Sequence, residues 1–377
     1  MPVMPVQRVD AHAGGRRAVL VTSPAAGSAV GVEQLVERLE ETAVSVALHL
    51  LVHDLDHTQP QGTIWRDQGY DLVIAAGGDG TVGAVATQLV GSDLPMAILP
   101  LGTANDVARS FYLPMDVTQA CGMLAGAVPL DIDVGQVIPG LVEPGAYSVE
   151  HGEPLLVGDP SPLAGVCFLH ALTLGLNVEF ARLATDVQRR QRLGSLTYAA
   201  SALEAVTRYR PVDVTLRVFG MEGSDGTTDA AEERVIQSRV VQVTAINTPV
   251  FGGKIGVRLP DIALDDRLLD FMLIEAVDVQ QLRQTVQRLL DSIILEPEQA
   301  NPANQAEQPL EGVGARLPGI RRFRAHAAII ETAEAVDVTL DGEIRTHTPA
   351  LVRVGPQRLR VLAPPQAKRL LTQTTRG

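Results

Sequence analysis

Five consecutive residues after an apolar run have the types needed to hold a phosphate group: Gly77, Gly78, Asp79, Gly80 and Thr81. A glycine pair after a buried strand lets the backbone turn tightly and direct its N–H groups toward a ligand oxygen. Residues 82–90 repeat apolar side chains at helical spacing, so the turn should begin a helix, whose N-terminus attracts anions. Asp79 would repel a phosphate unless a cation lay between them, which favours a magnesium contact. The alternative is a plain strand-to-helix turn in which Asp79 caps the helix.

A second turn of the same kind follows the apolar segment 95–100, and a helix should start after it. The turn has a glycine, a hydroxyl, an amide and a carboxylate in the order Gly102, Thr103, Asn105 and Asp106. Thr103 could donate to a phosphate, and Asp106 could share a metal with Asp79. Turns that follow successive parallel strands face one crevice at the carboxyl edge of the sheet. A third carboxylate, Asp133, lies where the chain should leave this sheet.

The ordered set of motifs resembles the diacylglycerol kinase catalytic-domain family, which includes sphingosine kinases and bacterial lipid kinases. After the two turns, the resemblance continues through Asp133-Val134-Gly135, Leu174-Gly175, Leu193-Gly194-Ser195-Leu196-Thr197-Tyr198, Phe251-Gly252-Gly253, Pro260-Asp261-Ile262-Ala263-Leu264-Asp265-Asp266 and Leu340-Asp341-Gly342-Glu343. NAD kinases and phosphofructokinases carry similar Gly-Gly-Asp-Gly-Thr turns, so that turn alone is weak. The complete order over nearly the whole chain is specific.

The resemblance implies transfer of the γ-phosphoryl group of ATP to a lipid hydroxyl with Mg²⁺. It assigns contacts with nucleotide phosphates to Ser23, Gly27, Gly77, Gly78, Asp79, Gly80, Thr81, Gly102, Thr103 and Asn105. It assigns the catalytic magnesium to Asp79, Asp106 and Asp133. Asp341-Gly342-Glu343 matches the base-bearing motif, and either Asp341 or Glu343 could abstract the proton from the acceptor. Asp-Gly is also a strong hairpin signal, and the two roles are compatible.

Three positions depart from the family pattern. Ser23-Pro24-Ala25-Ala26-Gly27 stands where the family has a turn that begins with Asn-Pro, which predicts altered nucleotide contacts. Arg267 replaces a turn glycine in a motif that often holds a second, structural magnesium, for which Asp266 and main-chain oxygens at Ala263 and Leu268 are the candidates. An arginine there loses easy access to positive φ and adds a fixed cation, so this second site stays open. His170, where the family often has Asn, is expected to be a hydrogen-bonded core residue.

The pattern of elements predicts an α/β plus β fold. Strands expected at 18–22, 46–52, 72–76 and 96–99 alternate with helices at 32–42, 82–90 and 117–124, which indicates an open, mostly parallel α/β nucleotide-binding domain. The β-branched runs at 212–219, 234–246, 268–275, 327–332 and 336–340 indicate an antiparallel β-sandwich, with helices at 193–209 and 279–295. We expect an unstructured lead at 1–15, the first domain at 16–130 with 353–377 packing back on it, and the lipid-binding sandwich at 131–352. Exposed loops are expected at 139–165 and 296–319.

Composition limits the partners. The 377 residues carry a net charge of −13 and only two lysines, Lys254 and Lys368, which argues against nucleic acid. No stretch approaches the roughly 20 apolar residues of a membrane-spanning helix, and we expect a cytoplasmic protein that meets a lipid substrate at the membrane surface. Homodimerisation is left open.

Two other functions fit parts of the sequence. An NAD kinase-like enzyme acting on a soluble acceptor would share the glycine turn and the parallel sheet. A catalytically inactive nucleotide-binding regulator would explain Ser23 and Arg267, but it would have no use for the five carboxylates Asp79, Asp106, Asp133, Asp341 and Glu343.

Overall fold

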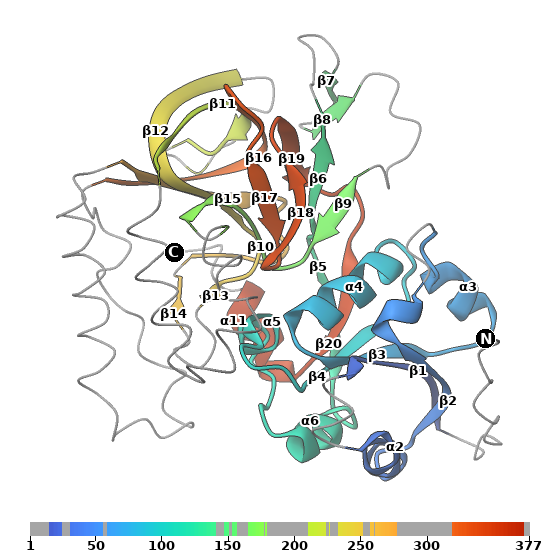
Figure 1. Cartoon of the computed structure of the whole chain (residues 1–377). Coiled ribbons are helices and arrows are strands. Elements are labelled where there is room, and N and C mark those ends of the chain that lie inside the picture. Colours follow the sequence, from blue (N-terminus) through green and yellow to red (C-terminus); the bar gives the residue numbers. More distant parts are fainter. Residues whose placement is uncertain are drawn as a thin grey trace, which may run out of the picture.

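The fold is seen in a computed structural model of the chain (Figure 1). It describes residues 15–24, 31–55, 59–140, 147–150, 153–156, 165–176, 178, 210–223, 226, 233–251, 257–259, 261–276 and 319–372. Several predictions fall outside these residues: the lead before Gly15, the position of Gly27, the two helices expected at 193–209 and 279–295, and nearly all of the loop at 296–319.

A six-stranded sheet forms the N-terminal part, with the strand order β2-β1-β3-β4-β20-β5. Its strands are β1 (Arg16–Thr22), β2 (Val44–Leu51), β3 (Leu72–Gly77), β4 (Met96–Pro100), β5 (Val128–Ile132) and β20 (Leu359–Ala363). All neighbouring pairs are parallel except β20 with β5. The predicted open, mostly parallel sheet is therefore confirmed.

Helices cover both faces of this sheet, and alternate strand residues point to two separate cores. The helices are α2 (Val32–Glu40), α3 (Gly62–Asp67), α4 (Asp79–Leu89), α5 (Asp106–Ser110), α6 (Val117–Met123) and α11 (Pro365–Thr372), with a short 3-10 turn η1 (Val52–Asp54). Val73 and Ala75 pack with α4, whereas Leu72 and Ile74 pack with α2 and α6. This period of two is what a strand buried on both faces requires. The helix start expected after the second turn is confirmed as α5, whereas the short helix α3 was not predicted, because six residues show too little periodicity.

A second, antiparallel sheet forms the C-terminal part, with the order β18-β17-β10-β12-β11-β16-β19-β6-β9, and β15 pairs with β12 and β16. Its strands are β6 (Gly135–Pro139), β9 (Val166–Phe168), β10 (Ala171–Gly175), β11 (Val212–Met221), β12 (Glu233–Ile246), β15 (Leu269–Glu275), β16 (Ile320–Thr332), β17 (Asp337–Leu340), β18 (Glu343–His347) and β19 (Ala350–Val354). The expected antiparallel β domain is confirmed.

Two small hairpins stand apart from the large sheets: β7 (Tyr147–Glu150) with β8 (Glu153–Leu156), and β13 (Val250–Phe251) with β14 (Val257–Arg258). The first lies within the stretch 139–165 that was expected to be a loop. That expectation followed from its proline, glycine and acidic content, but a four-residue strand needs too few apolar residues to change such a composition.

The chain crosses between the two sheets at two places. It leaves the first sheet between β5 and β6, and it returns between β19 and β20. The two crossings lie together, because the N–H of Gly355 donates to the carbonyl of Val134 at 2.7 Å. In Figure 1, α4 lies on the side of the first sheet that faces β9, β10 and β18 of the second.

Candidate active site

The two glycine turns are in direct contact. The N–H of Leu101 donates to the carbonyl of Gly77 at 3.0 Å, which joins the ends of β3 and β4. A β-carbon added to Gly102 would lie 2.4 Å from the α-carbon of Gly78, and one added to Gly78 would lie 3.2 Å from the α-carbon of Gly102. Both positions therefore need glycine for close approach of two backbones rather than for a positive φ. The carboxyl ends of two neighbouring parallel strands thus form one glycine-lined edge, as the sequence predicted.

Asp79 contacts the start of α5, the helix that begins with Asp106. Oδ1 of Asp79, the first residue of α4, accepts the N–H of Val107 at 3.0 Å, and Val107 follows Asp106 in the first turn of α5. The structure therefore places the carboxylate of Asp79 at the N-terminus of α5. Here the partial positive charge of the helix end favours an anion.

Asn105 clamps the second turn. Its φ of 55° lies in the left-handed region, and its side chain makes two hydrogen bonds with Gly102. Oδ1 accepts the N–H of Gly102 at 3.0 Å, and Nδ2 donates to the carbonyl of Gly102 at 2.9 Å. Asn tolerates this backbone better than most residues. The structure thus gives Asn105 a role in shaping the turn, while its expected contact with nucleotide stays a prediction.

The two threonines of the turns lie differently. Thr81 is buried, and a β-carbon on Gly77 would lie 2.3 Å from its Oγ1, so the Thr81 side chain fills the space beneath the first turn. Thr103 is exposed at the second turn. Of the two hydroxyls, that of Thr103 is the better placed for a ligand. Ser23 lies directly after β1, at the same edge of the sheet.

Asp341 lies at the tip of the β17–β18 hairpin and is held by three backbone N–H groups of the second domain. Oδ2 accepts from Leu169 at 2.9 Å, and Oδ1 accepts from His170 at 2.8 Å and from Ala171 at 3.0 Å. Burial raises the pKa of Asp341 to about 6 against the effect of these three donors, and the charge of Asp79 raises it further. The charge of Asp79 therefore reaches Asp341 across the boundary between the domains.

Asp341 and Glu343 both lie against glycines of α4. A β-carbon on Gly83 would lie 2.9 Å from Oδ2 of Asp341, and one on Gly80 would lie 3.0 Å from Oε1 of Glu343. The Glu343 side chain is 56% exposed and forms an ion pair with Arg345. The structure thus brings the acidic hairpin to the helix that starts with the first glycine turn, although 258 or more residues separate them in sequence.

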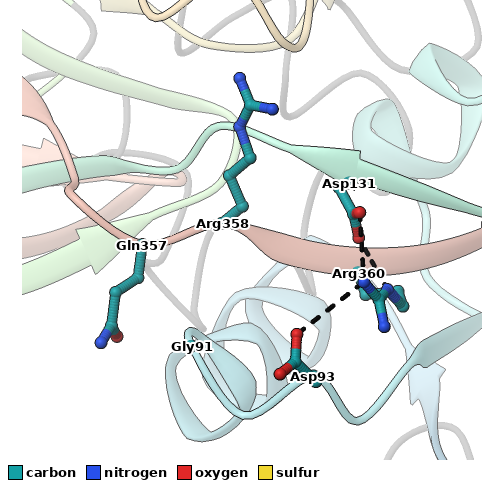
Figure 2. Close-up of a pocket in the computed structure, with 6 residues that line it drawn as sticks. All are labelled: Gly91, Asp93, Asp131, Gln357, Arg358 and Arg360. Carbon is teal, nitrogen blue, oxygen red and sulfur yellow. Dashed lines mark hydrogen bonds and ion pairs between the residues drawn. The ribbon is translucent and has the colours of Figure 1, made fainter.

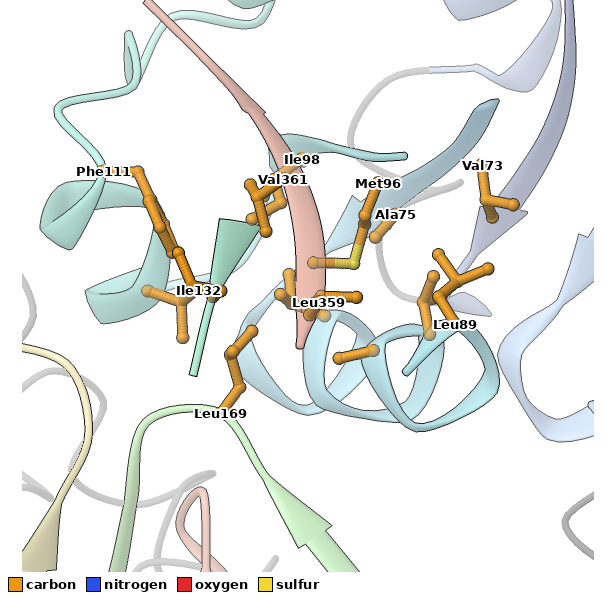
Figure 3. Close-up of a cluster of buried hydrophobic side chains, with 14 of the residues drawn as sticks. Val73, Ala75, Leu89, Met96, Ile98, Phe111, Ile132, Leu169, Leu359 and Val361 are labelled. Carbon is orange, nitrogen blue, oxygen red and sulfur yellow. The ribbon is translucent and has the colours of Figure 1, made fainter. Parts of the chain in front are cut away.

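A segment next to this hairpin fixes the second domain to the first. Leu169 belongs to the core around α4 and β20, and Figure 3 shows its side chain beside Leu359 and Ile132 in that cluster. Nδ2 of Asn247 donates to the carbonyls of Leu169 at 2.8 Å and of Asp133 at 3.0 Å. Neither Leu169 nor Asn247 was singled out from the sequence, since nothing in their local pattern distinguishes them.

His170 is buried, as expected, and hydrogen-bonded. Its Nδ1 lies 2.6 Å from Oγ1 of Thr248, and its ring centroid lies 4.3 Å from that of Phe251. Burial lowers its pKa to about 4, although the charge of Asp79 acts in the opposite direction. His170 is therefore a neutral, buried residue close to Asp79.

Asp133 is buried, and its carboxylate accepts hydrogen bonds from two arginines. Oδ2 accepts the N–H of Arg267 at 2.6 Å, and Oδ1 accepts Nε of Arg358 at 3.0 Å. Nη1 of Arg267 adds an ion pair with Oδ1 at 3.5 Å. This carboxylate therefore already has cationic partners, and within the described residues it forms no metal-binding group with Asp79 and Asp106. Its expected role as a ligand of the catalytic magnesium gains no support from this arrangement.

The residues proposed for a second, structural magnesium do not fit a metal. Oδ1 of Asp266 accepts the N–H of Leu268 at 3.0 Å, and Oδ2 accepts Nη1 of Arg324 at 3.2 Å. Burial raises the pKa of Asp266 to about 7, which disfavours the charged form that a metal needs. Within the described ranges, no group of three or more His, Cys, Asp or Glu side chains is arranged to hold a metal ion. Ala263 is buried in the same loop.

A shallow surface pocket lies elsewhere, lined by Gly91, Asp93, Asp131, Gln357, Arg358 and Arg360 (Figure 2). Gly91 lies past the C-terminal end of α4, whereas the glycine turns lie at its N-terminus. An 11-residue helix is roughly 16 Å long. Arg360 in this pocket is already paired with Asp131 at 2.7 Å and with Asp93 at 3.8 Å. The pocket is therefore distinct from the candidate active site.

Fold and site together define a two-domain protein in which a glycine-lined edge of a parallel sheet meets an acidic hairpin of an antiparallel sheet. Residues 17–137 match the diacylglycerol kinase catalytic domain, and residues 171–363 match the YegS C-terminal NAD kinase beta sandwich-like domain. The chain therefore belongs to the diacylglycerol kinase and YegS family of lipid kinases, as the sequence motifs predicted.

Individual relatives agree with this assignment. A diacylglycerol kinase of Bacillus subtilis is 23% identical over 274 residues, which cover 71% of this chain and 76% of the relative. A YegS-like probable lipid kinase of Klebsiella pneumoniae is 46% identical over 69 residues, or 18% of this chain and 23% of that protein. A crystal structure of a diacylglycerol kinase from Bacillus anthracis covers 94% of this chain and 99% of its own, with a TM-score of 0.58 and 18% identity. The last match shows the fold.

In the part of the chain that the structure describes, we find no helix with the length and apolar character needed to cross a membrane.

Proposed function

We propose that the protein transfers the γ-phosphoryl group of ATP to the hydroxyl of diacylglycerol or a related lipid alcohol, with Mg²⁺. The observation that carries this proposal is the position of Asp341 and Glu343 over Gly83 and Gly80 of α4. Phosphoryl transfer needs a cradle for the phosphates and a carboxylate beside the attacking hydroxyl. The contact between the hairpin and α4 supplies both at one place.

The glycine edge fits nucleotide phosphates. Side chains at Gly78 and Gly102 would close the space between the two turns. The N–H groups of Thr81 and Val82 donate to the carbonyl of Gly78, so the donors that would reach phosphate oxygens are the N–H groups of Asp79 and Gly80 and the hydroxyl of Thr103. Asp79 and Asp106 are the carboxylates that would hold Mg²⁺, which would spread the charge that develops on the transferred group.

Glu343 is the better candidate for the base. The two oxygens of Asp341 already accept three N–H groups, so its carboxylate orients the hairpin tip. The Glu343 side chain is solvent-accessible, and its Oε1 lies nearest the first turn of α4. In the proposed step, Glu343 takes the proton of the lipid hydroxyl, whose oxygen forms the new bond to the γ-phosphorus. The bond from that phosphorus to the bridging oxygen breaks, and ADP leaves.

The acceptor would be reached at a membrane surface, from a cytoplasmic protein that binds the bilayer transiently. Relatives named diacylglycerol kinase and probable lipid kinase support a lipid rather than a soluble acceptor. Aliphatic side chains do not distinguish one lipid alcohol from another, so the acceptor is assigned by experiment.

The test is transfer of labelled γ-phosphate from Mg-ATP to a panel of micellar lipid alcohols, with NAD and buffer as controls. We expect label in one lipid class, and a loss of about 10²- to 10⁴-fold in Glu343→Gln, as for removal of a general base. Glu334→Gln is the matched control, because Glu334 is an exposed carboxylate on the loop before β17. Label in NAD alone would favour the soluble-acceptor kinase. ATP binding without transfer to any acceptor would favour the regulatory protein.

A further inference from the structure

The loop that carries Asp266 lies at the two places where the chain crosses between the domains. Nη1 of Arg267 donates to the carbonyl of Gly355, on the return crossing, at 2.9 Å. Its backbone N–H donates to Asp133, on the outward crossing, at 2.6 Å. Arg267, a residue of the second domain, therefore forms hydrogen bonds with both crossings.

A second arginine completes this arrangement from the return crossing. Nε of Arg358 donates to Oδ1 of Asp133 at 3.0 Å, and its Nη2 donates to the carbonyl of Asp265 at 2.8 Å. Figure 2 shows that the Arg358 side chain points away from Gln357 and from the Arg360 pair in the surface pocket. Asp133, Asp265 and Asp266 thus lie around guanidinium groups at the junction.

Arg267 keeps the backbone conformation that a glycine would adopt easily. Its φ is 64°, in the left-handed region, where an L side chain is strained. Its carbonyl lies 2.8 Å from Nδ1 of His326, which fixes the loop from the side of β16. Contacts on both sides of Arg267 therefore stabilise this strained backbone conformation. The guanidinium at this position makes contacts with Gly355 and Asp133 that a glycine would lack.

We infer that the guanidinium of Arg267 supplies, within the chain, the positive charge that a divalent cation would otherwise supply at the Asp266 loop. The charge that neutralises Asp133 then comes from Arg267 and Arg358, and Arg324 meets Asp266 at 3.2 Å. The junction should hold its geometry without a metal. This inference concerns the domain junction and does not depend on the proposed lipid kinase reaction.

The test measures how many Mn²⁺ ions the full-length protein binds in the absence of nucleotide, by electron paramagnetic resonance. The wild type and Asp266→Asn should bind the same number of Mn²⁺ ions, because the loop binds none. Arg267→Gly, which also relieves the strained φ, should bind one ion more, and the double variant Arg267→Gly with Asp266→Asn should lose it.

Thermal unfolding gives a second reading that is independent of activity. The unfolding temperature of Arg267→Gly should fall in EDTA and recover when Mg²⁺ is added, and the recovery should vanish in the double variant. Arg217→Gln is the matched control, because it removes an arginine paired with Glu233 at 2.7 Å between β11 and β12. Its unfolding temperature should respond to Mg²⁺ as that of the wild type does.

Two results would overturn the inference. One is an ion bound by the wild type and lost in Asp266→Asn. The other is an Arg267→Gly variant that folds but gains neither an ion nor a response to Mg²⁺. If Arg267→Gly does not fold, the comparison of the wild type with Asp266→Asn still decides whether the native loop holds a metal.

Discussion

Oδ2 of Asp341 lies so close to Gly83 that a β-carbon on this glycine would be 2.9 Å from it. Because Asp341 is fixed by three backbone N–H groups, it cannot move away easily. We predict that Gly83→Ala displaces the hairpin tip and lowers kcat by about 10- to 100-fold, the scale expected for a misplacement of roughly 1 Å. Steady-state kinetics, together with urea unfolding, would separate this effect from a loss of stability.

Another glycine serves as the control for that prediction. A β-carbon added to Gly122 in α6 would have no atom within 4 Å, and Gly122→Ala should leave the kinetics unchanged. Equal effects of Gly83→Ala and Gly122→Ala would contradict the role of the contact with Asp341.

The raised pKa of Asp341 predicts opposite effects of pH on activity and on stability. Its pKa of about 6 lies above the ordinary value of 3.8, so the folded protein binds this proton more tightly than the unfolded chain does. The contribution of Asp341 to the free energy of unfolding should therefore fall as pH rises from about 4 to about 6 and then stay constant. The charged form that accepts the three N–H groups predominates only above pH 6, so kcat/KM should rise through that pH.

Asp341→Asn isolates this group from the other titrating side chains. The unfolding free energy of the wild type minus that of the variant should decrease as pH rises from 4 to 6, when measured by urea unfolding at each pH, because only the wild type loses a proton on unfolding in this range. A difference that does not change with pH would show that the Asp341 pKa is not raised.

The two hydrogen bonds of Asn105 to Gly102 lead to separate predictions for the unfolding free energy and for ATP affinity. Asn105→Ala loses both hydrogen bonds to Gly102 and places a poor residue at a φ of 55°, so we expect a loss of about 1–3 kcal/mol in unfolding free energy. Asn105→Gly accepts the backbone conformation and should lose less stability. Both variants should bind ATP more weakly, because the turn is no longer clamped. Calorimetric titration with ATP checks this, and unchanged affinity in both variants would argue against a nucleotide site at this turn.

The sequence predicted those parts of the site that depend on local pattern. The run before Gly77 and the segment before Gly102 became neighbouring parallel strands, and Asp341-Gly342 became a hairpin tip, because glycine turns and alternating apolar residues act over a few positions. Contacts across the domain boundary could not be predicted. Arg267 and Arg358 reach Asp133 from 134 and 225 positions away, so a carboxylate that looks like a metal ligand in sequence lies between arginines in the fold.

The last prediction concerns Arg258, which joins the small β13–β14 hairpin to the end of α5. Its Nη2 donates to the carbonyls of Arg109 at 3.2 Å and Ser110 at 3.3 Å, and its guanidinium lies 4.2 Å from the ring centroid of Tyr112. A cation at a helix C-terminus satisfies carbonyls that lack partners within the helix. Since α5 begins with Asp106, beside the second glycine turn, Arg258 should help to set the position of that carboxylate.

We expect Arg258→Gln to raise the KM for ATP more than it lowers kcat, and to reduce the unfolding free energy by about 1–3 kcal/mol, because buried carbonyls lose a charged donor. Arg258→Lys keeps the charge but cannot both bridge two carbonyls and stack on Tyr112. Its KM for ATP and its unfolding free energy should therefore lie between those of the wild type and of Arg258→Gln. Arg321→Gln removes a half-exposed arginine paired with Glu275 and serves as the control. If Arg258→Gln lost stability while its KM for ATP matched that of Arg321→Gln, the hairpin would support the fold without positioning the nucleotide turn.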